Sequence, residues 1–407
     1  MPLTNTATRY GAVTKTFHWL SALLIFTAFP LGWLASSLAE RIADPAISST
    51  DIDLARATTL FSLHKTIGVS LFTVAILRIL WTLAQPKPGL LNGDERTEAW
   101  LAETVHWLLY GSLVLVPLTG WIHHAAADGF APIWWPFGQS LPFIPKSPSL
   151  SELFSTLHFV FQLVLAGAIA LHVAGALKHH LIERDATLRR MLFSGTSGMP
   201  TTAQPSHLVS VLSALVIWAG ALGAGGAAGL FSPHTPPATT AALQAVESDW
   251  QVENGTLSLT ATQLGHPVTG SFADWTASIT YAEDLTADRN GAVKVTVSIP
   301  SLTLGSVTAQ AMGPDYFDAD SFVTAVFEAD ILRDGDDLRA DGTLTIKDHS
   351  VPISLPFVLD VQDDTATASG QVTLDRRAFG IGAKVEDEGT LAFSVLVEFT
   401  LVAHKAP

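Results

Sequence analysis

Apolar residues form five long runs in the first part of the chain and short alternating runs in the rest. The long runs cover about residues 16–38, 60–83, 101–124, 152–178 and 207–231. A helix that crosses a bilayer needs roughly 20 apolar residues, and each run is long enough. The pattern therefore predicts five transmembrane helices. The first run also has features of a secretory signal, but its length and the presence of His18 inside it favour a retained span.

The alternating pattern begins after residue 232. Between residues 293 and 299 apolar and polar side chains alternate, and residues 391–401 repeat this pattern. A two-residue period is typical of strands with one apolar face. We expect about eight strands in an antiparallel barrel or sandwich, and an eight-stranded barrel is large enough for one elongated ligand.

These patterns predict a multidomain chain with separate membrane and β parts. An all-α transmembrane domain is expected first and an all-β domain last, joined by an additional helix that serves as a tether. The expected parts are a four-helix domain at 1–192, a linker at 193–206, the fifth helix at 207–231, a second linker at 232–245 and the β domain at 246–407.

Composition and charge agree with this division. Hydrophobic residues make up 48% of the chain and charged residues 14%, against about 25% charged residues in soluble proteins. Residues 1–231 hold 13 Lys and Arg against 12 Asp and Glu, a net charge of +1, whereas residues 232–407 hold 9 against 25, a net charge of −16. The overall charge of −15 argues against a nucleic-acid partner.

Basic residues predict the orientation in the membrane. With the N-terminus inside, the outer loops hold few basic residues, namely Arg41, Arg56 and Lys146. The inner segments then hold Arg9, Lys15, Lys87, Arg96, Lys178, Arg184, Arg189 and Arg190. This distribution favours a cytoplasmic N-terminus. The fifth span then delivers the acidic C-terminal domain to the periplasm or the cell exterior.

The histidines of the spans provide candidate cofactor ligands. The chain has no cysteine, which excludes thiolate metal sites and covalent haem attachment. His158 and His172 lie fourteen residues apart in the fourth span, about 21 Å along a helix and nearly on one face. His64 matches the depth of His158, and His18 matches that of His172. Two facing imidazoles suit the axial positions of a noncovalent haem iron.

Basic and small residues near these histidines support the interpretation. Arg78 lies fourteen residues after His64, at the level of the inner pair, and Lys65 adjoins the outer pair. Both cations suit haem propionates, although Arg78 also fits simple snorkelling to the interface. Gly68, Gly175 and Ala168 lie about one turn from the histidines and would leave room for a macrocycle.

A set of motifs over about residues 8–192 carries a family resemblance. The motifs are Thr16-Phe17-His18-Trp19-Leu20, Leu63-His64-Lys65, Leu77-Arg78, His106 with Tyr110, His158, Leu171-His172 and Lys178-His179-His180. Together they resemble the bacterial cytochrome b561 family, whose members are four-helix proteins with two haem b groups that exchange electrons with quinones. One line of the family is associated with oxidation of superoxide and reduction of ubiquinone.

The resemblance implies roles for individual residues. His18 and His172 would bind the inner haem iron, and His64 and His158 the outer one. His106 would hydrogen-bond a propionate or a quinone, with a competing role as iron ligand. Independently of the resemblance, the adjacent residues His123 and His124 at the outer end of the third span suit a solvated helix end, with a proton or quinone role as the alternative.

The C-terminal part carries a second resemblance. Its motifs are Gly265-His266-Pro267-Val268-Thr269-Gly270-Ser271-Phe272, Asp315-Tyr316-Phe317-Asp318-Ala319, Gly342-Thr343-Leu344-Thr345-Ile346-Lys347 and Leu374-Asp375-Arg376-Arg377-Ala378-Phe379-Gly380-Ile381-Gly382. Over about residues 246–404 these resemble the YceI-like domain, a lipocalin-like barrel associated with polyisoprenoid and quinone lipids. The resemblance makes inward aromatic residues candidates for ligand contact. These are Phe272, Trp275, Phe317, Phe327 and Phe379.

Together the two parts suggest an inner-membrane oxidoreductase linked to the quinone pool. Two haem b groups would carry electrons across the bilayer, and the periplasmic barrel would bind ubiquinone or another isoprenoid. A periplasmic electron donor or superoxide would complete the reaction. The alternative hypothesis is an isoprenoid carrier in which the haem-containing helices act only as a redox-sensing anchor.

Overall fold

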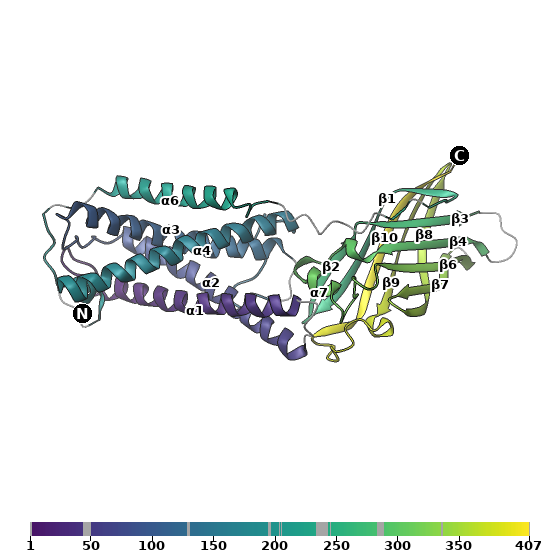
Figure 1. Cartoon of the computed structure of the whole chain (residues 1–407), viewed down its shortest axis with the longest axis horizontal. Coiled ribbons are helices and arrows are strands. Elements are labelled where there is room, and N and C mark those ends of the chain that lie inside the picture. The colour runs from purple at the N-terminus through teal and green to yellow at the C-terminus, as the bar shows by residue number, and fades with distance from the viewer. Residues whose placement is uncertain are drawn as a thin grey trace. The chain divides into compact units, whose positions relative to one another are not determined.

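A computed structural model describes residues 2–43, 50–127, 131–193, 197–202, 204, 206–232, 243–244, 246–282, 289–334 and 337–406. Five of its helices are long and apolar enough to cross a membrane, which confirms the predicted number (Figure 1). They are α1 (Ala12–Ala43), α2 (Asp51–Leu83), α3 (Arg96–Ala126), α4 (Pro148–Lys178) and α6 (His207–Ala227). The π-helical turn η1 (His179–Glu183) and the short helix α5 (Thr187–Met191) follow α4.

The first four helices begin four to nine residues before the predicted apolar runs, and α6 ends four residues early. Hydropathy detects only the apolar part of a helix, whereas the backbone hydrogen bonds continue through polar turns at its ends. The start of α4 shows one local cause. The Ser147 hydroxyl accepts a hydrogen bond from the Leu150 amide. Pro148 occupies the first turn, where backbone N–H groups have no acceptor within the helix, so the N–H that proline lacks costs no hydrogen bond.

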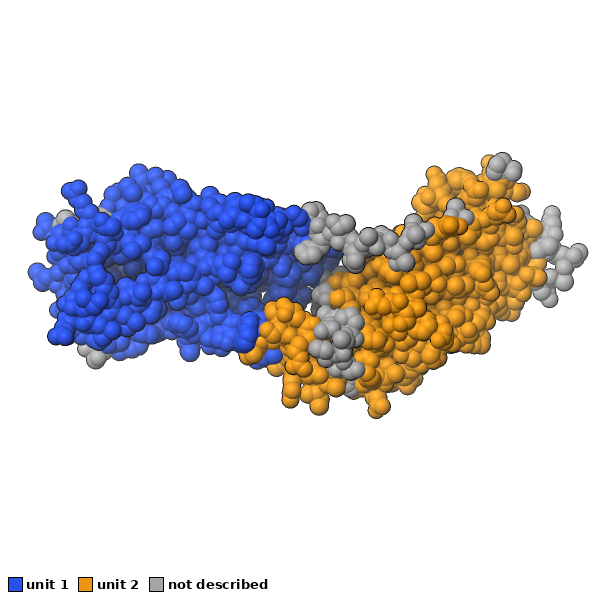
Figure 2. All heavy atoms as spheres, viewed as in Figure 1, with its two compact units in different colours: residues 1–33, 60–127, 132–234 blue, residues 34–59, 128–131, 235–407 orange. Residues whose placement is uncertain are grey.

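The chain divides into two compact units (Figure 2). The first, called the membrane unit below, comprises residues 1–33, 60–127 and 132–234. The second, the β unit, comprises residues 34–59, 128–131 and 235–407. Of the predicted linker at 232–245, all but residues 232, 243 and 244 lie outside the described part of the chain.

Helix α6 packs directly on the bundle in addition to joining the parts of the chain. Ala214 lies in one buried cluster with Leu108 of α3 and Ala168 of α4. The Trp218 indole donates to the Ser112 hydroxyl at 3.3 Å. A Cβ at Gly111 would lie 2.1 Å from the Trp218 ring, so only glycine lets this indole reach α3. The predicted tether is therefore also a packed fifth helix of the membrane unit.

Within the described residues of the β unit, the strands form one antiparallel sheet of ten in the order β3-β4-β6-β7-β8-β9-β10-β1-β2-β5. The strands are β1 (Trp250–Gln263), β2 (His266–Phe272), β3 (Trp275–Tyr281), β4 (Arg289–Ser298), β5 (Leu302–Thr303), β6 (Thr324–Asp334), β7 (Asp337–Ile346), β8 (His349–Gln362), β9 (Thr365–Asp375) and β10 (Leu391–Lys405). The estimate of eight strands was too low. Strand β5 has only two residues, and so short a pairing leaves no alternating pattern in the sequence.

The sheet curls into a lipocalin-like barrel (Figure 1). Just before β1, the Asp249 amide donates to the Ile279 carbonyl of β3 at 3.1 Å, so the two sides of the sheet meet there. Strand β1 has two bulges, at Val252/Asn254 and Ala261/Gln263, which increase local twist. The short helix α7 (Thr308–Met312) packs through Ala311 on apolar residues of β1 and β2 at one end of the barrel.

Arg376, in the 3-10 turn η4 (Arg376–Phe379), organises the loop before β10. Its side chain is 3% exposed. All five of its N–H groups have backbone carbonyl acceptors within 3.1 Å. The acceptors belong to Ile381, Gly382, Val385, Leu391 and Ala392. One guanidinium therefore satisfies five carbonyls that would otherwise be buried without donors.

Substitution Arg376→Leu should destabilise the β unit by about 3 kcal/mol or more, because several buried carbonyls lose their donors. The measurement is denaturant unfolding of the detergent-solubilised chain, followed through near-ultraviolet circular dichroism. The matched control is Arg289→Leu, whose side chain is 60% exposed and pairs with exposed Asp330, so little change is expected. Equal stability of both variants would contradict the assigned role.

Candidate functional site

Polar and small residues recur at fourteen-residue intervals on the four helices α1 to α4. Fourteen residues correspond to about 21 Å of helix and leave two positions about 40° apart around the axis. Each helix therefore presents one residue at each of two levels of the bundle. The inner and outer partners are His18 and Gly32 on α1, Arg78 and His64 on α2, His106 and Gly120 on α3, and His172 and His158 on α4.

At the outer level, His64 and His158 face one another with ring centres 6.3 Å apart. Nδ1 of His64 lies 2.9 Å from the Ala28 carbonyl, and Nδ1 of His158 lies 2.8 Å from the Val116 carbonyl. Because a carbonyl oxygen only accepts, each Nδ1 carries the proton. In the neutral imidazole this leaves an Nε2 lone pair for a metal ion.

Two glycines make room for these outer imidazoles. A Cβ at Gly32 would lie 2.7 Å from Cε1 of His64, and a Cβ at Gly120 would lie 2.9 Å from Nδ1 of His158. Both distances are shorter than carbon contacts allow, so any larger residue would displace the ring. Each glycine also stands one turn after the carbonyl that accepts the imidazole N–H, namely Ala28 or Val116. The backbone of α1 and α3 thus positions the two histidines symmetrically.

At the inner level, His18 and His172 have ring centres 6.0 Å apart. His106 lies beside them, with its ring centre 5.2 Å from that of His172 in an edge-on arrangement. Nδ1 of His106 donates to the Ala102 carbonyl at 2.6 Å. Three imidazoles from three helices therefore meet at this level, and His106 is placed as a neighbour of the pair.

The two predicted cations lie at their expected levels. Arg78 is close enough to His18 and His172 for its charge to act on both imidazoles, and its guanidinium stands 5.1 Å from the centre of the Tyr110 ring. Lys65 is 7% exposed and adjoins the outer pair. Both groups can pair with carboxylates of a bound cofactor.

The geometry of both pairs fits a six-coordinate haem. A transition metal binds an imidazole nitrogen at about 2 Å, so two imidazoles on opposite sides of one metal ion place their ring centres about 6 Å apart. The observed separations are 6.0 and 6.3 Å. Added Cβ atoms at Gly68 and Gly175 would meet nothing within 4 Å, in line with room for a macrocycle. Two such histidines would together hold the iron of a haem, and a haem held in this way would supply electron-transfer chemistry.

Ala168 does not provide the room that the sequence indicated. It is 2% exposed and lies against Leu108 and Ala214. A small residue at this position lets α3, α4 and α6 pack closely together. The spacing of residues along α4 could not distinguish this packing role from the predicted role of leaving room for a cofactor.

His123 and His124 lie near the outer pair and are not a solvated helix end. Their ring centres are 4.4 Å apart, and Nδ1 of His123 lies 2.8 Å from the Ser151 carbonyl. His124 is close enough to His64 and His158 for electrostatic interaction. The outer level therefore holds more imidazoles than its two facing histidines.

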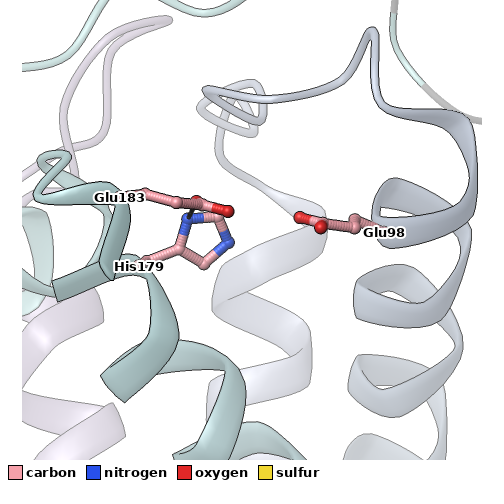
Figure 3. Close-up of side chains that lie close together, drawn as sticks. All are labelled: Glu98, His179 and Glu183. Atoms are coloured by element: carbon pink, nitrogen blue, oxygen red, sulfur yellow. Dashed lines mark ion pairs between the residues drawn. The ribbon is translucent and has the colours of Figure 1, made fainter. Parts of the chain in front are cut away.

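Figure 3 shows a separate group at the end of α4, where His179 and Glu183 approach Glu98 of α3. The side chains are close enough to share a metal ion. However, the Lys178 ammonium already contacts Glu98 and lies 2.7 Å from Glu183. His179 is paired with Asp185 at 2.7 Å. These contacts form an ion-pair network that joins α3 to α4 and occupies the carboxylates.

The β unit encloses an elongated cavity of about 320 Å³. Its lining extends along β1 from Trp250 to Gln263 and consists mainly of aliphatic and aromatic side chains. All five aromatic residues proposed from the sequence line it: Phe272, Trp275, Phe317, Phe327 and Phe379. This arrangement can remove an apolar chain from water.

The sequence reasoning missed Gly32 and Gly120. Both stand fourteen residues after a histidine already singled out, His18 or His106. The same interval that connects His158 with His172 would have identified them. Gln263 was also missed, because one glutamine at the end of a strand has no recognisable pattern.

Comparisons with known proteins agree with the two-part architecture. Residues 9–194 match the profile of prokaryotic cytochrome b561, and residues 249–400 match the YceI-like domain. Cytochrome b561 homolog 2 of Escherichia coli is 31% identical over 202 residues, which are 48% of this chain and 98% of that protein. The protein named probable superoxide oxidase CybB of Yersinia pestis is 25% identical over 185 residues, 45% of this chain and 96% of that protein.

Two solved structures resemble part of the chain. BcnA of Burkholderia cenocepacia is 27% identical and covers 36% of this chain and 95% of its own, with a TM-score of 0.34. The YceI protein of Campylobacter jejuni is 18% identical and covers 42% of this chain and 95% of its own, with a TM-score of 0.31. The two family profiles, the Escherichia coli relative and five helices long and apolar enough to cross a bilayer show that the chain is a membrane protein that belongs to the prokaryotic cytochrome b561 family and carries a YceI-like domain in its C-terminal part.

Proposed function

We propose that the chain is an inner-membrane electron-transfer protein with two haem b groups, acting as an oxidoreductase of the quinone pool. The observation that carries this proposal is the presence of two facing histidine pairs, at two levels of one bundle, with ring centres 6.0 and 6.3 Å apart. The levels are separated by about 21 Å along the helices. Electrons that pass between haems at these two levels would therefore move from one side of the bilayer toward the other.

The residues of the chain would hold and tune the cofactors. His18 with His172, and His64 with His158, would supply the axial nitrogens. Arg78, Lys65 and His106 would bind propionates. A bound haem supplies reversible one-electron chemistry of its iron. The protein sets the ligands, excludes water and neutralises the carboxylates.

The β unit would bind an isoprenoid quinone. Its apolar cavity suits an isoprenoid tail, which gains about 0.8 kcal/mol for each methylene removed from water. The excess of basic residues on the inner segments, which precede the first helix, join the second to the third and follow the fourth, supports a cytoplasmic N-terminus and a periplasmic β unit. Quinone capture and electron transfer would then take place in one chain.

Two electron donors remain as candidates. Ubiquinol follows from the quinone interpretation, and superoxide follows from the likeness to the relative named probable superoxide oxidase. Lys65 and Lys146 would attract a small anion, whereas the net charge of −16 on residues 232–407 would repel it. In the alternative function, an isoprenoid carrier with a redox-sensing anchor, neither donor would sustain turnover.

Variants His64→Ala and His172→Ala should each lose about half of the haem bound per chain, because each removes one axial ligand from a different pair. The measurement is haem per protein, with optical spectra of the purified membrane protein. His180→Ala, at an exposed position beyond α4, is the control and should keep its haem. Full haem content in both site variants would refute the ligand assignment.

Variant Gly120→Ala should selectively weaken the outer site. The new Cβ would press on the His158 imidazole, so up to half of the haem should be lost while the spectrum of the inner haem persists. Gly220→Ala on α6, where a Cβ meets nothing within 4 Å, should retain all haem. Equal haem content in the two variants would show that the glycine does not position the ligand.

Ubiquinol should reduce the haem-loaded chain in anaerobic membranes, measured as the change in haem absorbance. A parallel assay with enzymatically generated superoxide at several salt concentrations compares the second donor, since attraction of an anion weakens with salt. Failure of both donors, with lipid still bound to the β unit, would reject the oxidoreductase and favour the carrier.

A further inference from the structure

The cavity of the β unit has one polar end. Gln263, Gln310 and Tyr316 line the part closed by α7. Tyr316 lies in a buried cluster with Leu391, and Leu391 is the β10 partner of Gln263 in the sheet register. The polar side chains therefore converge on the end of β1, while aliphatic and aromatic residues line most of its length.

Gln263 is the unusual member of this group. It is 4% exposed and closes β1 at a bulge, with its side chain in the cavity lining. Its side-chain amide makes no hydrogen bond with any residue that the structure describes. A buried primary amide offers two donors and an acceptor, and burying them without partners is unfavourable. The amide is thus available to a molecule inside the cavity.

The other polar groups at this end already have partners. The Gln310 amide nitrogen donates to the Tyr316 hydroxyl at 2.9 Å. The five N–H groups of Arg376 are all committed to backbone carbonyls. Lys347 donates to the Tyr316 carbonyl, and Lys384 pairs with Asp315. At this end the Gln263 amide can therefore bind a ligand. The cationic groups that would bind a phosphate are already paired with protein acceptors.

The opposite end of β1 differs in this respect. The Trp250 indole donates to the Tyr281 carbonyl, and the Tyr281 hydroxyl accepts from Arg333. The polar groups there have protein partners, and the walls between the two ends are apolar. From Trp250 to Gln263 the strand makes thirteen steps of about 3.3 Å each. A long apolar tail fits along this distance, with its polar head at Gln263.

We propose that Gln263 binds the uncharged head group of the β-unit ligand, with the apolar tail directed toward Trp250. The amide N–H donates to a quinone carbonyl, and the amide oxygen accepts from a quinol hydroxyl, so one side chain serves both redox forms. Neutral carbonyl or hydroxyl heads are preferred over isoprenyl phosphates. This inference rests on the proposed binding of an isoprenoid by the β unit and specifies its chemical class and orientation.

The test uses the delipidated full chain and a ubiquinone analogue with a photoreactive ring. Labelled residues are located by mass spectrometry, which separates labelling of the β unit from labelling of the helices. In the wild type, the label should fall near Gln263, Gln310 and Tyr316. Gln263→Met should reduce this labelling about tenfold, the equivalent of about 1.4 kcal/mol. Gln371→Met, at an exposed position on β9, should leave it unchanged.

A photoreactive hydrocarbon of the same length, without a polar head, checks that the variant barrel is intact. It should label Gln263→Met and wild type equally, and loss of this labelling calls for the same assay on Gln263→Leu. Competition adds a second readout, since farnesol should displace the quinone analogue at least tenfold better than farnesyl phosphate.

Three results would overturn the inference. Labelling at the Trp250 end would reverse the orientation. Labelling that survives both Gln263 substitutions would remove the head-group role, and equal competition by the phosphate would remove the preference for a neutral head. In each case lipid binding itself would stand. If neither the quinone nor the hydrocarbon labelled the wild-type β unit, the proposed isoprenoid binding would fail as well.

Discussion

An imidazole within a lipid bilayer has no water to satisfy its two nitrogens, and the membrane unit is organised around this constraint. At the outer level, backbone carbonyls of α1 and α3 accept one N–H from each histidine. The second nitrogen of each ring is then left for another partner, which we propose to be a metal ion. A metal ion between the two rings would satisfy both at the observed spacing, so stability and the proposed cofactor binding would impose the same geometry.

A single helical interval repeats this solution at two levels. Fourteen residues return a helix to nearly the same face, so four helices can present two sets of side chains, one above the other. The sets are not identical. The inner level has His106 and Arg78 where the outer level has Gly120 and His64. The inner haem would therefore lie beside Arg78 and His106, and the outer haem would lie beside Lys65 and be more tightly enclosed by backbone.

The β unit solves a different problem, because it must keep an apolar interior accessible without collapsing. Arg376 fixes the loop before β10 through five carbonyls, and α7 packs over one end of the barrel. These contacts hold the wall of the cavity in place, and the few polar groups at its end would select the proposed ligand. If the bundle binds haem as proposed, one chain would carry both the quinone-binding domain and the electron-transfer cofactors.

The sequence by itself determined the five membrane helices, the antiparallel β domain and the pairing of histidines by depth, because hydropathy and the helical repeat are local properties of the chain. It could not determine the ten-strand count, the packing of α6 or the true surroundings of Ala168, since these depend on contacts between distant segments. Only the tertiary structure revealed the carbonyl partners of His64 and His158 and the buried amide of Gln263. Hydrogen bonds across helices and the enclosure of a cavity arise only when separate elements come together in space.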